Sequence, residues 1–101
     1  MGNEKQENYS TRDIYLATTL TTLKFKMVGI DYQIEGERGM PVGYFMFERT
    51  PELIEAEQKF WRGEIAVEPR MFISNLRSIK AEINNIYKNP HSKFDSVKPK
   101  K

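Results

Sequence analysis

Apolar residues recur at two different periods along this chain of 101 residues, and the two periods predict helices and strands. Leu16, Leu20 and Leu23 are spaced as on one face of a helix. Ser10 precedes this run, and Asp13 follows Ser10 by three positions, a spacing typical of a capped helix start. We therefore predict a helix that begins directly after Ser10.

Strict alternation of apolar and polar residues follows over 28–34 and predicts a half-buried strand. A second strand is predicted over 43–48, where Phe45 and Phe47 share one face. The residues between them, 35–42, include two glycines and a proline and predict a turn. Together these segments indicate an antiparallel β-hairpin with a long tip.

Two further helices are marked by their end signals. Thr50 and Pro51 are a favoured N-cap and first helical residue, and Gly63 is placed to end that helix. Pro69 begins the last helix, which Pro90 ends. The predicted buried face of this last helix consists of Phe72, Leu76, Ile79, Ile83 and Ile86.

The predicted order is α-β-β-α-α, which places the protein in the α+β class as one small domain. Since a hairpin alone is marginal in water, we expect the helices to pack on it and supply the core. The domain is predicted to cover residues 9–89. Residues 1–8 and 90–101 lack apolar periodicity and are predicted to be flexible tails.

The net charge of +2 is unevenly distributed along the chain. Residues 9–89 contain eleven basic and eleven acidic residues, so the excess positive charge lies in the C-terminal tail. The chain has no cysteine, no apolar leader at its start and no apolar run long enough to span a membrane. These features predict a cytoplasmic protein that does not insert into membranes.

Catalytic chemistry is not indicated. The only histidine, His91, lies beyond the proline that ends the last helix. The acids Glu52, Glu55 and Glu57 are typical of a solvated helix start, where the helix dipole favours them. No metal-ligand spacing and no phosphate-binding glycine pattern is present. We therefore predict no enzyme activity, no catalytic residues, no metal and no cofactor.

A stripe of basic and polar residues lies opposite the apolar face of the last helix. At 100° per residue it consists of Arg70, Arg77, Asn84 and Lys88, with Lys80 at its edge. Lys98, Lys100 and Lys101 in the tail extend the positive charge. Such a stripe can follow nucleic-acid phosphates, can meet an acidic protein surface, or is simply a solvated helix face.

Aromatic residues of the hairpin are the second feature. If the helices cover the face of Phe45 and Phe47, then Tyr44 and Met46, and Tyr32 with them, face away. Such a surface can stack on single-stranded bases, form a homodimer interface, or be an ordinary cross-strand cluster.

Four segments together resemble a known family: residues 10–17, residues 44–48, residues 60–64 and residues 67–70 with Phe72, Leu76 and Lys80. The family consists of small domains of unknown function carried by phages, prophages and other mobile elements of bacteria and archaea. The resemblance covers about residues 9–88. It implies the domain limits and a mobile-element origin, and it implies no catalytic residues.

We accordingly expect a non-enzymatic accessory protein of a phage or mobile element that binds nucleic acid or another protein. A protein-binding inhibitor of a host defence system, such as an anti-CRISPR, is the alternative.

Overall fold

The computed structural model describes residues 8–88. Its elements are β1 (Asn8–Thr11), α1 (Ile14–Thr22), β2 (Met27–Glu35), β3 (Met40–Glu48), α2 (Pro51–Trp61) and α3 (Pro69–Lys88). The α+β class is therefore confirmed, and so is the antiparallel pairing of the two hairpin strands. The predicted tails lie, apart from Asn8, outside the described residues.

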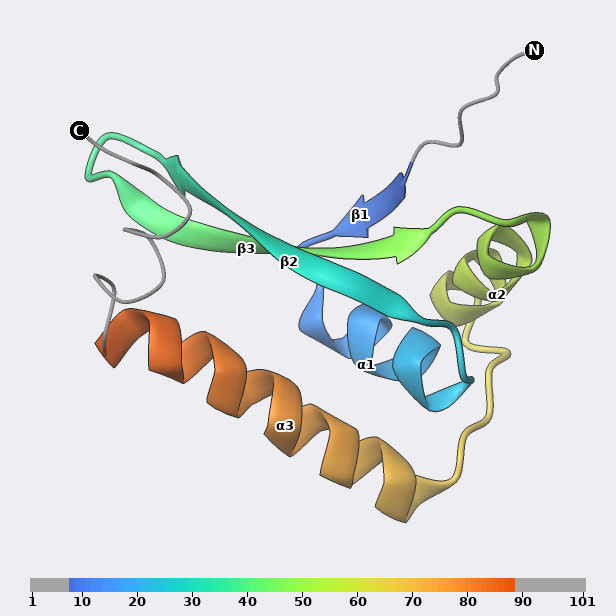
Figure 1. Ribbon diagram of the computed structural model, residues 1–101. Helices are drawn as coiled ribbons and strands as arrows, with labels where there is room; N and C mark the ends of the chain where they lie inside the picture. The colour runs from blue at the N-terminus through green and yellow to red at the C-terminus, as the bar shows by residue number, and fades with distance from the viewer. Residues whose placement is uncertain (1–7, 89–101) are drawn as a thin grey trace, which may run out of the picture.

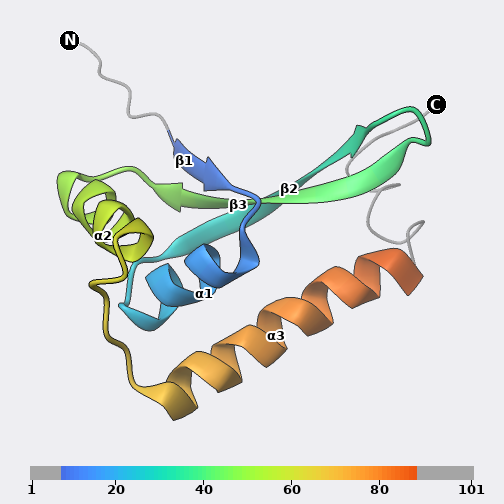
Figure 2. The same cartoon turned by 180° about the vertical axis from the view of Figure 1, so that it is seen from behind.

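The three strands form one antiparallel sheet in the order β1-β3-β2. β3 is central, and β1 pairs only with the second half of β3, from Phe45 to Glu48. The helices lie on one side of this sheet, and α1 lies between the sheet and α3 (Figures 1 and 2). The hairpin tip is shorter than predicted, because the strands extend to Glu35 and Met40.

The first strand was missed by the sequence prediction, and the predicted start of the first helix was wrong. Ser10 pairs with Met46 in the sheet instead of capping a helix. The N-cap is Asp13, whose carboxylate accepts hydrogen bonds from the backbone N–H groups of Tyr15 and Leu16 at 2.9 and 3.0 Å. Ser10 could also cap a helix, but here it pairs with the edge of β3 as a strand residue.

The register of β2 differs from strict alternation at its start. Met27 pairs with Phe47 and Gly29 with Met46, so Val28 is an extra residue in a β-bulge. Val28 is consequently half exposed, whereas Met27, opposite Phe47, packs against the core.

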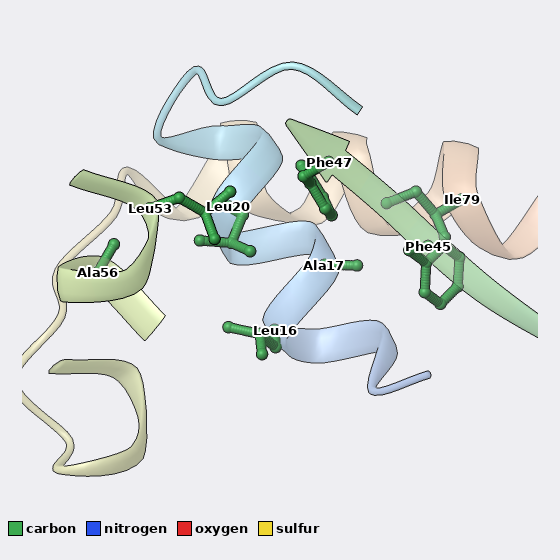
Figure 3. Packing of buried hydrophobic residues seen from close by; sticks show 8 residues of the cluster. All are labelled: Leu16, Ala17, Leu20, Phe45, Phe47, Leu53, Ala56 and Ile79. Atoms are coloured by element: carbon green, nitrogen blue, oxygen red, sulfur yellow. The ribbon is translucent and has the colours of Figure 1, made fainter. Parts of the chain in front are cut away.

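The core lies where α1 meets the sheet, α2 and α3. It is shown in Figure 3 and consists of Leu16, Ala17, Leu20, Phe45, Phe47, Leu53, Ala56 and Ile79. Leu20 of α1 lies beside Leu53 of α2, and Phe45 of β3 lies beside Ile79 of α3 (Figure 3). The predicted inner faces of β3 and α3 are therefore confirmed at Phe45, Phe47 and Ile79.

Threonines complete the buried surface of α1. The hydroxyls of Thr18, Thr19 and Thr22 donate to the carbonyls four residues earlier, at 2.7 to 2.8 Å. The Thr22 hydroxyl also accepts a hydrogen bond from the Asn75 side-chain amide of α3 at 3.0 Å. Because these three hydroxyls have partners, their burial costs little, whereas the buried hydroxyl of Thr21 has no hydrogen-bond partner among the described residues.

Two helices end with the same backbone arrangement. At the end of α2, Gly63 has a φ of 72°, and Glu64 donates its N–H to the Lys59 carbonyl at 2.9 Å. At the end of α1, Lys24 takes the corresponding left-handed conformation, with a φ of 79°. The prediction that Gly63 follows the end of α2 is confirmed, and Lys24 shows that the motif also forms without glycine.

Gly43 allows α3 to approach the hairpin. A Cβ atom added at Gly43 would lie 3.2 Å from the Ile83 side chain and 3.3 Å from the Ile30 side chain. The absence of a side chain on β3 at this position therefore makes room for the C-terminal half of α3.

We predict that Asp13→Ala lowers the free energy of unfolding by about 1 kcal/mol, because two backbone N–H groups lose their acceptor. Ser10→Ala is the matched control and should change stability much less, since Ser10 does not cap the helix in the structure. Urea unfolding followed by circular dichroism measures both variants. A larger loss for Ser10→Ala than for Asp13→Ala would contradict the observed cap.

Candidate nucleic-acid interface

The side of α3 that packs on the protein fixes which side faces solvent. Ile79 is buried, and Phe72, Leu76 and Ile83 are half-buried on the same face. The Asn75–Thr22 hydrogen bond adds a polar contact to α1 on this side. The helix can therefore not rotate about its axis without breaking these contacts, and its opposite side is left to solvent.

The predicted basic stripe lies on this solvent side. Arg70, Arg77, Lys80 and Asn84 are all exposed. Lys88 is the last residue of α3, whereas the three predicted tail lysines, Lys98, Lys100 and Lys101, lie outside the described residues.

Arg70, Arg77 and Lys80 take part in no ion pair among the residues that the structure describes. Ion pairs of the described residues join Arg12 to Glu35, Lys59 to Glu55 and Arg62 to Glu64. None of them includes Arg70, Arg77 or Lys80. Exposed cations without ion pairs occur elsewhere as well, so the distinguishing property of these three is their alignment on one helix face.

Three further residues of the stripe were missed by the sequence analysis. Ser74 and Ala81 are exposed, have short side chains and lie between the basic positions. Ile73 is also exposed, at 48%, and at 100° per residue it lies beside Arg77 and Lys80. A helical projection of all residues of α3, rather than of the charged ones alone, would have identified them. Glu82 lies on the flank, about 120° from Arg70.

The face of the sheet that points away from the helices carries a second polar cluster. The Tyr44 hydroxyl donates a hydrogen bond to Glu35 at 2.6 Å across the two hairpin strands. Arg12 pairs with the same carboxylate at 3.5 Å, and its guanidinium lies 5.9 Å from the centre of the Tyr44 ring. Sequence reasoning did not find this cluster, because its members are distant along the chain.

Of the three predicted interface residues, only two lie on this open face. Tyr44 and Met46 are half-buried and point away from the Phe45 side. Tyr32 pairs with Gly43 and therefore faces the helices, with its ring near Gly43 and Ile83. The prediction that Tyr32 faces away was wrong, because its pairing with Gly43 places it on the same face of the sheet as Phe45.

The hydrogen bond to Glu35 raises the pKa of the Tyr44 hydroxyl above its ordinary value, with burial and the charge of Glu35 acting in the same direction. Burial raises the pKa of Tyr9 on β1 as well, with the carboxylate of Glu57 as the second cause. Both hydroxyls are therefore held in their neutral form to higher pH than free tyrosine.

Between residues 8 and 88, no three His, Cys, Asp or Glu side chains are grouped so that they could hold a metal ion. His91 lies outside this range. No described helix is long and apolar enough to cross a membrane. The absence of enzyme activity stays a prediction.

The fold and the aligned stripe thus define a small α+β domain with one exposed basic helix. The model of a domain of unknown function, DUF5659, matches residues 6–85, and the chain belongs to this family. The resemblance to a family of unknown function is confirmed to that extent. No curated protein and no solved structure matches the chain significantly.

We predict that Tyr44→Phe reduces the loss of stability at alkaline pH. Because the pKa of Tyr44 is raised in the folded protein, its hydrogen bond contributes fully below about pH 10 and is lost as the pH rises further. The variant lacks this contribution at every pH, so its free energy of unfolding should fall less between pH 9 and pH 11.

Urea unfolding at a series of pH values measures this difference. Tyr15→Phe is the matched control, because the Tyr15 side chain is exposed. It should show the pH dependence of the unmodified protein. The same steep alkaline loss in Tyr44→Phe and in the unmodified protein would contradict the role of the Tyr44–Glu35 hydrogen bond.

Proposed function

We propose that this protein binds nucleic acid through the exposed stripe of α3 and catalyses no reaction. The observation that carries the proposal is the alignment of Arg70, Arg77 and Lys80 on the solvent side of one helix, with no ion-pair partner among residues 8–88. Phosphate groups are the polyanion that such a row of cations can follow.

The distribution of charge supports the same partner. α3 has four basic residues and one acid, and residues 9–89 as a whole are neutral, so the rest of that segment carries a net charge of −3. A polyanion is therefore attracted to α3 and repelled by much of the remaining surface. The interaction would orient the protein with α3 toward its partner.

The setting of this function is proposed from the sequence resemblance, which implies an accessory protein of a phage or mobile element. An acidic protein surface is the competing partner for the same stripe. A protein inhibitor of a host defence system, of the anti-CRISPR kind, would use the stripe in that way. The two partners are distinguished by the experiment that follows.

We predict that Arg70→Gln combined with Arg77→Gln weakens nucleic-acid binding and lowers its salt dependence. Each phosphate contact contributes about 0.9 to the slope of log K against log salt for duplex DNA, so the slope should fall by about 2. Fluorescence anisotropy with a labelled oligonucleotide, from low to moderate salt, measures both quantities.

Lys26→Gln combined with Arg38→Gln is the matched control, because it removes two exposed charges outside α3. It should leave the slope nearly unchanged. No binding of any nucleic acid at low salt would overturn the proposed function, and stoichiometric capture of an acidic protein through the same arginines would then support the competing partner.

We further propose that two copies associate through the open face of the sheet, where Tyr44 and Met46 are half-buried. Sedimentation equilibrium should then give the mass of two chains at high concentration. Met46→Lys places a charge in the centre of this face and should return the mass to that of one chain. The mass of a single chain for the unmodified protein at high concentration would contradict the dimer.

A further inference from the structure

We infer that α3 enters the major groove of duplex DNA and contacts base edges there. The inference rests on the proposed function and names its partner. Three properties of α3 carry it: its length and exposure, the short side chains within the stripe, and an exposed isoleucine among the cations.

The dimensions of α3 fit a groove. The helix has twenty residues and is about 30 Å long. It is the outermost element on the helix side of the molecule, with no other labelled element beyond it in either view (Figures 1 and 2). Arg70 and Arg77 are separated by about 10 Å along the axis, which is about the rise of three base pairs.

Short side chains on the stripe allow the helix backbone to come close to a partner. Ser74 lies between Arg70 and Arg77, and Ala81 lies between Lys80 and Asn84; both expose little more than a hydroxyl or a methyl group. Long side chains at these positions would hold the helix away from base edges. Arginine, serine and asparagine on the same face are residue types that hydrogen-bond to bases in the major groove.

Ile73 is the residue that phosphate binding alone does not account for. Its side chain is 48% exposed and does not belong to the core cluster of buried residues. It lies beside Arg77 and Lys80, where a solvated basic face gains nothing from an isoleucine. The C5-methyl group of thymine is the apolar feature of the major groove, and an apolar side chain is its usual contact.

Other nucleic acids fit these features less well. Single strands are bound largely by stacking on aromatic rings, whereas the described stripe residues include no aromatic side chain. Tyr44, the aromatic residue on the open sheet face, is held by Glu35 and Arg12. The major groove of duplex RNA is too deep and narrow for a helix to read.

The test compares two pools of random duplexes that are identical except that every thymine is replaced by uracil in one. The two differ in the major groove only, by the C5-methyl group. The unmodified protein should prefer the thymine pool by about fourfold for each methyl group that it contacts. The preference should disappear in Ile73→Ala, while the salt dependence stays unchanged because no charge is altered.

Ala81→Phe gives a second variant, because a bulky side chain in the middle of the stripe should block entry into the groove. We expect it to weaken duplex DNA binding by about tenfold, a loss comparable to that of one good base contact. Gln58→Phe, at an exposed position of α2, is the matched control and should bind as the unmodified protein does. Circular dichroism confirms that each variant is folded.

The outcomes separate the two proposals. Equal binding of the thymine and uracil pools would overturn the major-groove inference while leaving nucleic-acid binding intact. So would binding of single strands and duplex RNA as tight as that of duplex DNA. The absence of binding to every nucleic acid at low salt would overturn the proposed function itself.

Discussion

The burial of α1 is the constraint on which the rest of the structure depends. All residues from Leu16 to Leu20 are buried, and Thr22 is buried as well, although the helix has only nine residues. A hydroxyl buried without a partner costs about 1 to 3 kcal/mol. Back-bonding of Thr18, Thr19 and Thr22 to the preceding turn removes most of that cost. The helix can therefore contact the sheet, α2 and α3 at the same time.

Because α1 is enclosed, the orientation of α3 is determined by what α1 presents to it. Ile79 enters the core beside Phe45, and Asn75 meets the Thr22 hydroxyl. These contacts require only that the opposite side of α3 be polar enough to face water. They do not require that its cations align or that an isoleucine be exposed among them. The composition of the outer side is thus not explained by packing, and the proposed binding role would account for it.

Much of this arrangement was predictable, and the exceptions have physical reasons. Alternation placed Phe45 and Phe47 correctly, and the proline signals placed the starts of α2 and α3. The strand β1 was not predictable from periodicity, since four residues are too few and Ser10 is a good helix cap as well as an acceptable strand residue. Whether these residues form a strand or a helix start depends on pairing with the edge of β3, which is distant in sequence.

In the candidate site, too, residues of one element could be predicted from the sequence, whereas residues that meet only through the sheet could not. The stripe of α3 follows from helix geometry alone, because every residue in it belongs to one regular element. The Arg12–Glu35–Tyr44 cluster requires that β1, β2 and β3 be brought together, and only the register of the sheet reveals it. Tyr32 was assigned to the wrong face for a related reason, since its side depends on its pairing with Gly43.

The layered arrangement also determines how charge acts at a distance. The folded body has no net charge, so at separations beyond about 10 Å in ordinary salt it exerts little attraction on a polyanion. At closer range the basic side of α3 and the net negative remainder of the body act in opposite directions. The attraction to α3 and the repulsion by the remaining surface together favour approach by the α3 face and suppress nonspecific binding elsewhere. In the proposed complex, contacts made after that approach by Ile73 and the short side chains beside it would decide how tightly the DNA is held.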